Sequence, residues 1–144
     1  MGLSRKSLVA AGLAFLAVFS WILFKPQAHV QWLQYSKVGE ERMIETHKPY
    51  ILFFTGNSCL TCHAQEKMWD NATVEKHLRD KGITPIRSII DDDVNKSQEL
   101  QAMKDHQALF TPAYVLVDKN GKVYFSDSIY STQAMIDFLD QAAV

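Results

Sequence analysis

The chain has 144 residues and a net charge of −1, and this length suits a single domain. Three of its 15 basic residues lie before Pro26 and none of its 16 acidic residues does, so the remaining chain carries a net charge of −4. Nucleic-acid-binding domains usually present a basic face, so this charge argues against a nucleic acid partner. About half of the residues are apolar (47%), which is enough to fill a core.

The first 25 residues have the composition of a membrane segment. Arg5 and Lys6 precede 17 residues without a charge, residues 8–24. As a helix this run would be about 25 Å long, near the lower limit for crossing a bilayer. Basic residues before the run predict that this end stays in the cytoplasm and that the rest is exported. We therefore expect a single-pass signal anchor at residues 1–25. A cleaved signal peptide is the alternative, although its apolar region is normally only about 7–15 residues long.

The next part of the chain predicts a strand, a helix and a second strand. Residues 26–36 are expected to form a tether and a first strand, because side chains alternate over residues 30–35. The charged residues 37–47 predict a short helix that ends before Pro49. Residues 50–54 (YILFF) are an unbroken apolar run, which is typical of a strand buried on both faces.

Helices and strands continue to alternate through the middle of the chain. Residues 59–82 predict two consecutive pieces of helix, divided near residue 70 and stopped by a glycine. The apolar residues 83–90 predict the next strand. Residues 97–106 predict a helix whose Leu100 and Met103 face the core.

The last third predicts a hairpin and a closing helix. Residues 113–118 and 122–126 flank Asn120-Gly121, and Asn-Gly between apolar runs is a strong hairpin signal. A final helix is expected from about residue 131 to 143. The whole order predicts an α/β fold with a mixed central sheet, in which the central strands are parallel and helices cover both faces. The domain then comprises the first strand and residues 37–144.

Cys59 and Cys62 are the only cysteines, and they lie where the buried strand turns into a helix. The first amides of a helix lack internal partners and the helix dipole is positive there, so both would stabilise a thiolate at Cys59. Cys-x-x-Cys motifs use this effect to obtain a reactive cysteine. Cys62, one turn later, is close enough to form a disulfide with Cys59. The pattern predicts thiol–disulfide exchange, in which Cys59 attacks a substrate disulfide and Cys62 resolves the mixed disulfide.

Other uses of the motif stay open. Cys-x-x-Cys-His also attaches c-type haem, with His63 as the iron ligand. Structural zinc needs four ligands and the chain has no second cysteine pair, whereas copper handling by the two thiols and His63 is a further alternative. A purely structural disulfide would gain little, because it closes a two-residue loop. The other histidines are expected at the surface: His29, His47, His77 and His106.

Two stretches of the chain, KPYILFFTGNSCLTCHAQEKMWDNATVEKHL and FTPAYVLVDKNGKVYF, resemble a thioredoxin-fold domain. The likeness is greatest to the periplasmic C-terminal domain of DsbD-type thiol:disulfide interchange proteins, and it covers residues 30–143. It implies that Cys59 is the nucleophile and Cys62 the resolving thiol of a redox-active disulfide. It also implies that the Thr111–Pro112 bond is cis, lies against the disulfide and holds the substrate chain.

The resemblance extends to one acidic residue and has three departures. Glu66 matches an acidic residue that tunes the thiols in DsbD-type domains, and His63 is a second candidate for tuning them; an ordinary surface glutamate is the alternative for Glu66. Ser58 stands where the family usually has Trp, Phe53 where thioredoxins carry a buried Asp, and Phe110 where a small residue is usual. These departures leave open a binding module that kept the fold and lost the redox activity.

The resemblance, together with the N-terminal run, implies a membrane-anchored thiol:disulfide oxidoreductase. Its domain would lie in the periplasm of a bacterium, tethered to the inner membrane. Its partners would be protein thiols and disulfides, with neither a metal nor a cofactor beyond the disulfide itself. The likeness favours the reducing direction. Because the periplasm is kept oxidising, such a reductase would need electrons from a membrane protein.

Overall fold

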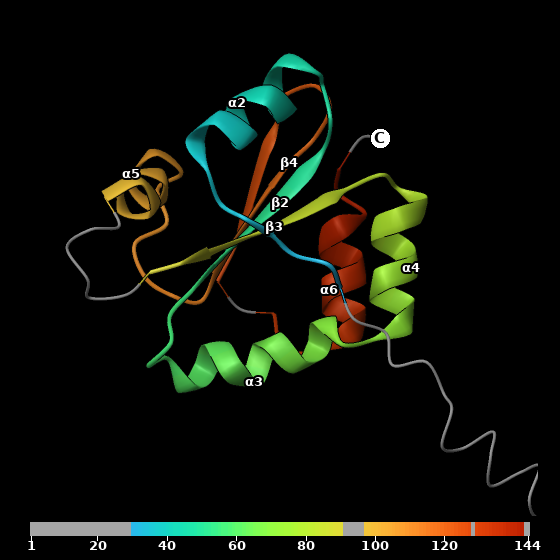
Figure 1. The fold of residues 1–144 in the computed structure, drawn as a ribbon. Helices are drawn as coiled ribbons and strands as arrows, with labels where there is room; N and C mark the ends of the chain where they lie inside the picture. Colours follow the sequence, from blue (N-terminus) through green and yellow to red (C-terminus); the bar gives the residue numbers. More distant parts are fainter. Residues whose placement is uncertain (1–29, 91–96, 128, 143–144) are drawn as a thin grey trace, which may run out of the picture.

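The computed structural model describes residues 30–90, 97–127 and 129–142 (Figure 1). The expected anchor and the first part of the tether lie outside these residues. Within the described ranges, no helix has the length and apolar character needed to span a bilayer.

The described residues form five strands and five helices, in the alternating order that the sequence predicts. The strands are β1 (Leu33–Gln34), β2 (Tyr50–Thr55), β3 (Thr84–Ile89), β4 (Ala113–Val117) and β5 (Val123–Ser126). The helices are α2 (Lys37–Glu45), α3 (Leu60–Trp69), α4 (Ala72–Asp80), α5 (Ser97–Asp105) and α6 (Thr132–Leu139).

The strands form one mixed sheet in the order β1-β3-β2-β4-β5. β1, β3 and β2 are parallel, β4 runs antiparallel to β2, and β5 runs antiparallel to β4. The mixed sheet is therefore confirmed. Parallel pairing at the centre is limited to β2 and β3, because β4 enters the hairpin in the opposite direction.

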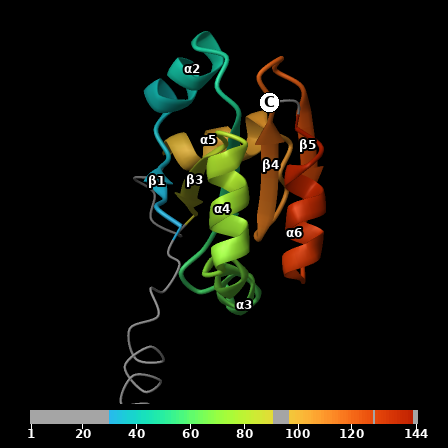
Figure 2. The ribbon, with the colours of Figure 1, turned by 90° about the vertical axis from the view of Figure 1, so that its right-hand side faces the viewer.

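β2 is the centre of the core, and all six of its residues are buried. Its side chains alternate between two apolar clusters, with Ile51 and Phe53 in one and Leu52 and Phe54 in the other. Figure 1 shows α4 and α6 on one side of the sheet and α2 and α5 on the opposite side; Figure 2 shows α4 and α6 in front of the strands. The prediction of a strand buried on both faces is confirmed.

The burial of α5 differs from the expectation in one residue. Leu100 is 40% exposed, and the buried residue of this helix is Ala102. Met103 is partly buried against the cluster that contains Leu52, as expected. Leu100 and Met103 are both apolar, so spacing alone placed Leu100 on the wrong side of the helix.

One polar cluster joins α2, β2 and the end of α5, on the side of the sheet that α2 and α5 cover (Figure 1). The carboxylate of Glu40 in α2 is buried and accepts hydrogen bonds from the hydroxyls of Tyr35 (2.9 Å) and Tyr50 (3.0 Å). His106, just after α5, also contacts this carboxylate through Nε2. The expectation that His106 is a surface residue is therefore wrong, because the folded chain brings a buried carboxylate to its ring.

Candidate active site

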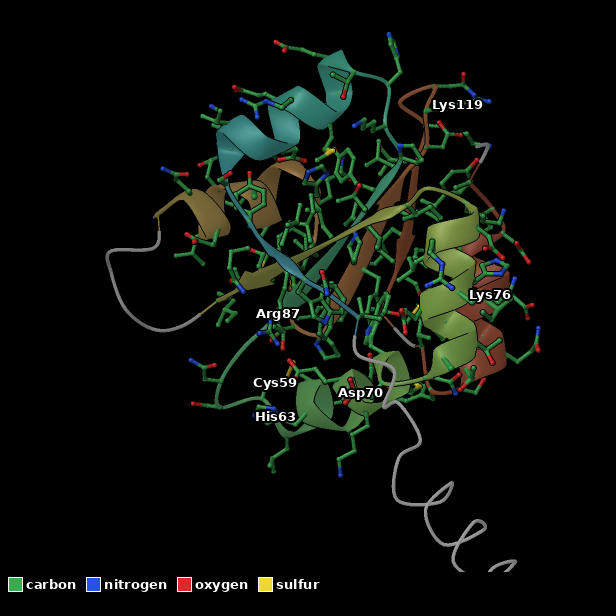
Figure 3. All side chains as sticks on the ribbon, turned by 45° about the vertical axis from the view of Figure 1, so that its right-hand side comes forward. Cys59, His63, Asp70, Lys76, Arg87 and Lys119 are labelled. Carbon is green, nitrogen blue, oxygen red and sulfur yellow. A yellow bond between two sulfur atoms is a disulfide. The ribbon has the colours of Figure 1, made fainter. Side chains whose placement is uncertain are left out.

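The turn between β2 and α3 carries the first cysteine. β2 ends at Thr55, the amide of Cys59 donates to the carbonyl of Gly56 (3.1 Å), and Cys59 is the N-cap of α3. Gly56 is tightly enclosed, because a Cβ there would lie 3.0 Å from the carbonyl oxygen of Ile90. Figure 3 shows Cys59 and His63 at the start of α3. The strand-to-helix position predicted for the dithiol is the observed one.

The two cysteines form a disulfide and differ in accessibility. Their Cα atoms are 5.2 Å apart. Cys59 is partly exposed and Cys62 is fully buried (0%), so an incoming sulfur can reach only Cys59. The Sγ atom of Cys59 accepts a hydrogen bond from the amide of Cys62 (3.2 Å). The first turn of α3 has no acidic side chain to oppose its dipole. This environment would stabilise a thiolate at Cys59 after reduction.

A second segment, just before β4, lies against the disulfide. The Thr111–Pro112 peptide bond is cis. The carbonyl oxygen of Thr111 is 3.9 Å from the Sγ atom of Cys59, and Pro112 is buried. The sequence separates these segments by about fifty residues, and the pairing of β2 with β4 brings them together. The placement implied by the resemblance is observed, whereas substrate binding by this segment stays a prediction.

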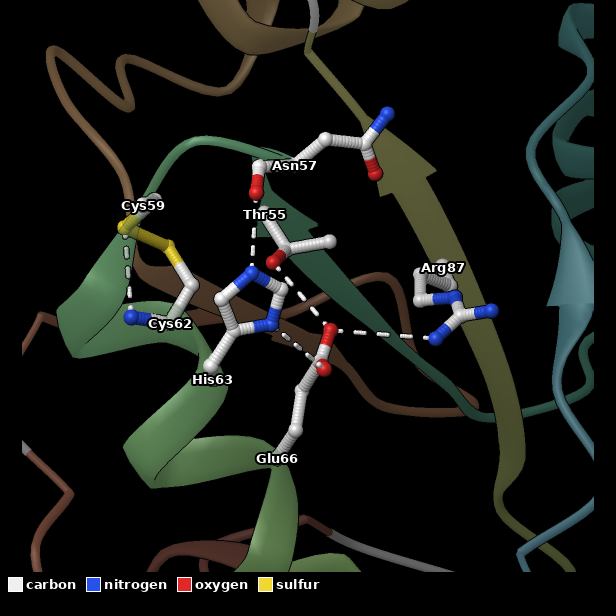
Figure 4. Close-up of polar contacts among 7 residues, drawn as sticks. All are labelled: Thr55, Asn57, Cys59, Cys62, His63, Glu66 and Arg87. Carbon is white, nitrogen blue, oxygen red and sulfur yellow. Dashed lines mark hydrogen bonds and ion pairs between the residues drawn. A yellow bond between two sulfur atoms is a disulfide. The ribbon is translucent and has the colours of Figure 1, made fainter.

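His63 and Glu66 belong to a polar network beside the disulfide (Figure 4). The Nε2 atom of the His63 ring is 2.8 Å from the carbonyl oxygen of Asn57, and Nδ1 is 3.4 Å from Oε2 of Glu66. The other carboxylate oxygen of Glu66 accepts a hydrogen bond from the Thr55 hydroxyl (3.3 Å) and lies 3.7 Å from a guanidinium nitrogen of Arg87. Glu66 is therefore held from three sides.

The network favours a charged His63. The carbonyl of Asn57 and the carboxylate of Glu66 raise the pKa of the His63 ring above its ordinary value. A cation at this place lies within the first turns of the helix that Cys59 caps. Both candidates for tuning the thiols are thus joined in one hydrogen-bonded group.

An aromatic cluster occupies the position where thioredoxins carry a buried aspartate. Phe53 is fully buried and stacks on Tyr114, with ring centroids 4.8 Å apart and planes 7° apart. Trp32 and Trp69 pack around it at 5.7 and 6.2 Å. Phe53 pairs in register with Arg87 of β3, yet the guanidinium contacts Glu66. In this chain the carboxylate near the dithiol therefore comes from α3 and not from β2.

Three residues of the network were not singled out from the sequence: Thr55, Asn57 and Arg87. Arg87 had a usable signal, because it is the only charged residue in the apolar run 83–90. A charge in a mostly buried strand usually has a partner. Thr55 and Asn57 carried no such signal, since a hydroxyl at the end of a strand is common and Asn57 takes part only through its backbone carbonyl.

The alternative uses of the motif can be compared with this geometry. Both ring nitrogens of His63 face protein oxygens, and a haem or copper ligand would need one of them. Within residues 30–90, 97–127 and 129–142, no three side chains of the His, Cys, Asp and Glu types gather in a way that suits a metal ion.

The fold and the bridged cysteine pair define a thioredoxin-fold thiol:disulfide oxidoreductase. A family model described as a thioredoxin-like domain matches residues 38–143. The chain belongs to this thioredoxin-like family. No curated protein matches its sequence.

Solved structures share the fold at low sequence identity. An oxidoreductase named DsbH has a TM-score of 0.62 at 20% identity, covering 81% of this chain and 88% of its own. The oxidised C-terminal domain of DsbD from Neisseria meningitidis has a TM-score of 0.60 at 14% identity, covering 78% and 100%. A disulphide isomerase from Xylella fastidiosa Temecula1 has a TM-score of 0.50 at 24% identity, covering 78% and 96%. These likenesses establish the fold.

Proposed function

We propose that this protein reduces disulfides of client proteins through the Cys59–Cys62 pair. One observation carries the proposal: Cys59 is partly exposed at the start of α3, and the fully buried Cys62 is bonded to it from the next turn. The cis Thr111–Pro112 segment beside that sulfur would hold the client chain through its backbone.

The reaction has two exchange steps. In the first, the Cys59 thiolate attacks a client disulfide, so that a Cys59–client S–S bond forms and the client S–S bond breaks. In the second, the Cys62 thiolate attacks Cys59, which restores the intramolecular disulfide and releases the second client thiolate. Two electrons pass from the dithiol to the client, and the two protons of the dithiol end on the client sulfurs.

The surroundings of the pair favour protein clients over small disulfides. Leu60, directly after Cys59, is 86% exposed, and Phe110, directly before Thr111, is 52% exposed. Exposed apolar side chains that flank both segments of a site are typical of a surface that contacts another protein. Phe110 replaces a small residue of the family pattern, so we expect it to affect which clients are accepted.

The test is reduction of an insulin disulfide by the purified, reduced chain. We expect the reduced wild type to reduce one insulin disulfide per chain, no reduction by Cys59→Ser, and a trapped mixed disulfide with the client in Cys62→Ser. The Cys59→Ser and Cys62→Ser chains are matched controls for each other, because each keeps one thiol. No reduction by the wild type, or equal activity in Cys59→Ser, would refute the proposal. A sharp Soret band in the purified chain would point to haem attachment instead.

The proposal includes a place in the cell. We infer that residues 1–25 anchor the protein in the inner membrane of a bacterium, with the domain in the periplasm. The charges and length of the N-terminal run support this inference. A membrane protein that passes electrons from the cytoplasm would keep the pair reduced, and the anchor would keep the domain next to such a donor.

A further inference from the structure

His63 is tied at two points to the turn that carries Cys59. Its backbone amide donates to the carbonyl of Cys59 (3.1 Å), as the first hydrogen bond of α3 requires. Its ring reaches back across the turn to the carbonyl of Asn57, two residues before Cys59. Figure 4 shows the ring between Asn57 and Glu66. The side chain therefore links the turn to the helix in addition to the disulfide.

The chemistry of the ring makes this link depend on its charge. Both ring nitrogens face oxygen acceptors, the carbonyl of Asn57 and the carboxylate of Glu66. Only the doubly protonated ring can donate to both, because a neutral imidazole has one N–H and one lone pair. A neutral ring must therefore point a lone pair at one of the two oxygens. The shorter contact, to Asn57, is the one that the neutral ring would keep, and Glu66 would be released.

The charged groups around the ring come from two elements. On α3 they are Glu66 and, one turn after His63, Lys67; on β3 the charge is Arg87, which contacts Glu66 from the other side. After reduction, the thiols of Cys59 and Cys62 add two more titratable groups. Asn57 and Glu66 raise the pKa of His63, so the charged ring is favoured below that raised pKa and is lost as the pH rises through it.

We propose that His63 is a positioning residue whose charged ring holds both the Asn57–Cys59 turn and the Glu66 carboxylate, so that the reactivity of Cys59 depends on the charge of His63. This inference deepens the exchange function proposed above and rests on it. An imidazolium on the residue four after Cys59 adds positive charge to the N-terminal end of the helix that Cys59 caps. When the ring becomes neutral, that charge and the hold on Glu66 are lost together.

The test is the alkylation rate of the reduced full chain by iodoacetamide, measured by mass spectrometry from pH 5 to 9. At pH 6 we expect His63→Gln to react about two- to fivefold more slowly than the wild type, the range for one charge near a helix end. Glutamine keeps a hydrogen-bonding side chain and removes the charge. The two rates should converge as the pH rises, because the wild-type ring loses its charge when the pH passes its raised pKa. His63→Lys should keep the wild-type rate at pH 6, because it keeps a positive charge at this position.

The matched control is His77→Gln, which removes another histidine paired with a carboxylate, Asp140, between α4 and α6. It should react like the wild type at every pH. A wild-type to His63→Gln ratio that stays constant with pH would show a merely structural role and overturn the proposal. Equal rates at pH 6, or a His63→Lys chain that behaves like His63→Gln, would overturn it as well.

A second measurement does not depend on reactivity. In the oxidised chain, an NMR titration of the His63 ring should give a lower pKa in Glu66→Gln than in the wild type; an unchanged value would contradict the hold on Glu66. Alkylation needs no client disulfide. A chain that fails to reduce insulin but shows the pH-dependent ratio would therefore refute the proposed function and support the role of His63.

Discussion

Phe53 shows how one residue changes the chemistry beneath the dithiol. It is fully buried among Trp32, Trp69 and Tyr114, at the position where thioredoxins have an aspartate. An aromatic ring cannot accept the proton of a resolving cysteine. Glu66, held by His63, Thr55 and Arg87, is the carboxylate that this chain offers beside the pair.

Because of this packing, restoring the thioredoxin residue should damage the fold. Phe53→Asp removes a buried ring and inserts a carboxylate into an apolar cluster, so we expect a loss of at least about 3–5 kcal/mol in the free energy of unfolding. Urea unfolding of the oxidised chain measures it. Phe125→Asp is the matched control, since Phe125 is 47% exposed on β5 and should cost only about 1 kcal/mol. Equal losses in the two variants would refute this account of the cluster.

At the scale of elements, Glu40 joins α2 to β2 and to the end of α5. Burial disfavours its charge. The contact with His106 and the hydrogen bonds from Tyr35 and Tyr50 outweigh that effect, and the pKa of Glu40 lies below its ordinary value. A carboxyl whose pKa is lowered by folding stabilises the fold above its unfolded pKa, and this contribution is lost as the pH falls through the folded pKa.

Glu40→Gln should therefore destabilise the chain in a pH-dependent way. At pH 7 we expect a loss of about 1.5–3 kcal/mol, the range for hydrogen bonds to a charged group. Below about pH 4.3, where an unfolded glutamate becomes protonated, the difference from the wild type should shrink. Urea unfolding at pH 7, 5 and 3.5 measures it. The neighbouring Glu41→Gln is the control, because Glu41 is exposed and should change little. A loss that is the same at every pH would contradict the charge argument.

At the scale of the whole molecule, the domain carries the redox pair and the proposed anchor sets where the domain lies in the cell. The two apolar clusters on either side of the sheet stabilise the domain, and the disulfide closes only a short loop between Cys59 and Cys62. The redox pair can therefore cycle without dismantling the fold. The direction of electron flow through the pair depends on the electron donor, and we propose that the anchor keeps the domain near this donor.

In the cells that the protein comes from, we expect the full chain to stay in the membrane pellet after alkaline carbonate extraction. Acid trapping followed by maleimide labelling should find Cys59 and Cys62 largely reduced. The control replaces residues 1–25 with a cleavable signal peptide; it should appear in the soluble periplasm with more of the pair oxidised. A wholly oxidised pair in the anchored chain would refute the reducing role, and a fully extractable chain would refute the anchor.

Local sequence signals determined much of this protein. The apolar run 50–54 predicted a strand buried on both faces, because a short unbroken apolar run between Pro49 and Gly56 is typical of a central strand. Cys59 and Cys62, which follow this run, predicted a disulfide at a helix start, since they are one helical turn apart. Asn120-Gly121 predicted the hairpin for an equally local reason, with Gly121 at φ 77°.

Only the tertiary structure decided which distant groups meet. Sheet pairing set Thr111 against Cys59, which the family resemblance implied but local spacing did not, and it brought Arg87 of β3 to Glu66 of α3. Folding also brought the partly buried ring of His106 to the buried carboxylate of Glu40. Spacing along the chain predicts which side chains can share a face, but not always which face is buried, as Leu100 shows, nor what the opposite element carries. The hold of His63 on Asn57 likewise depends on how the turn folds back over the helix, which the residue types do not reveal.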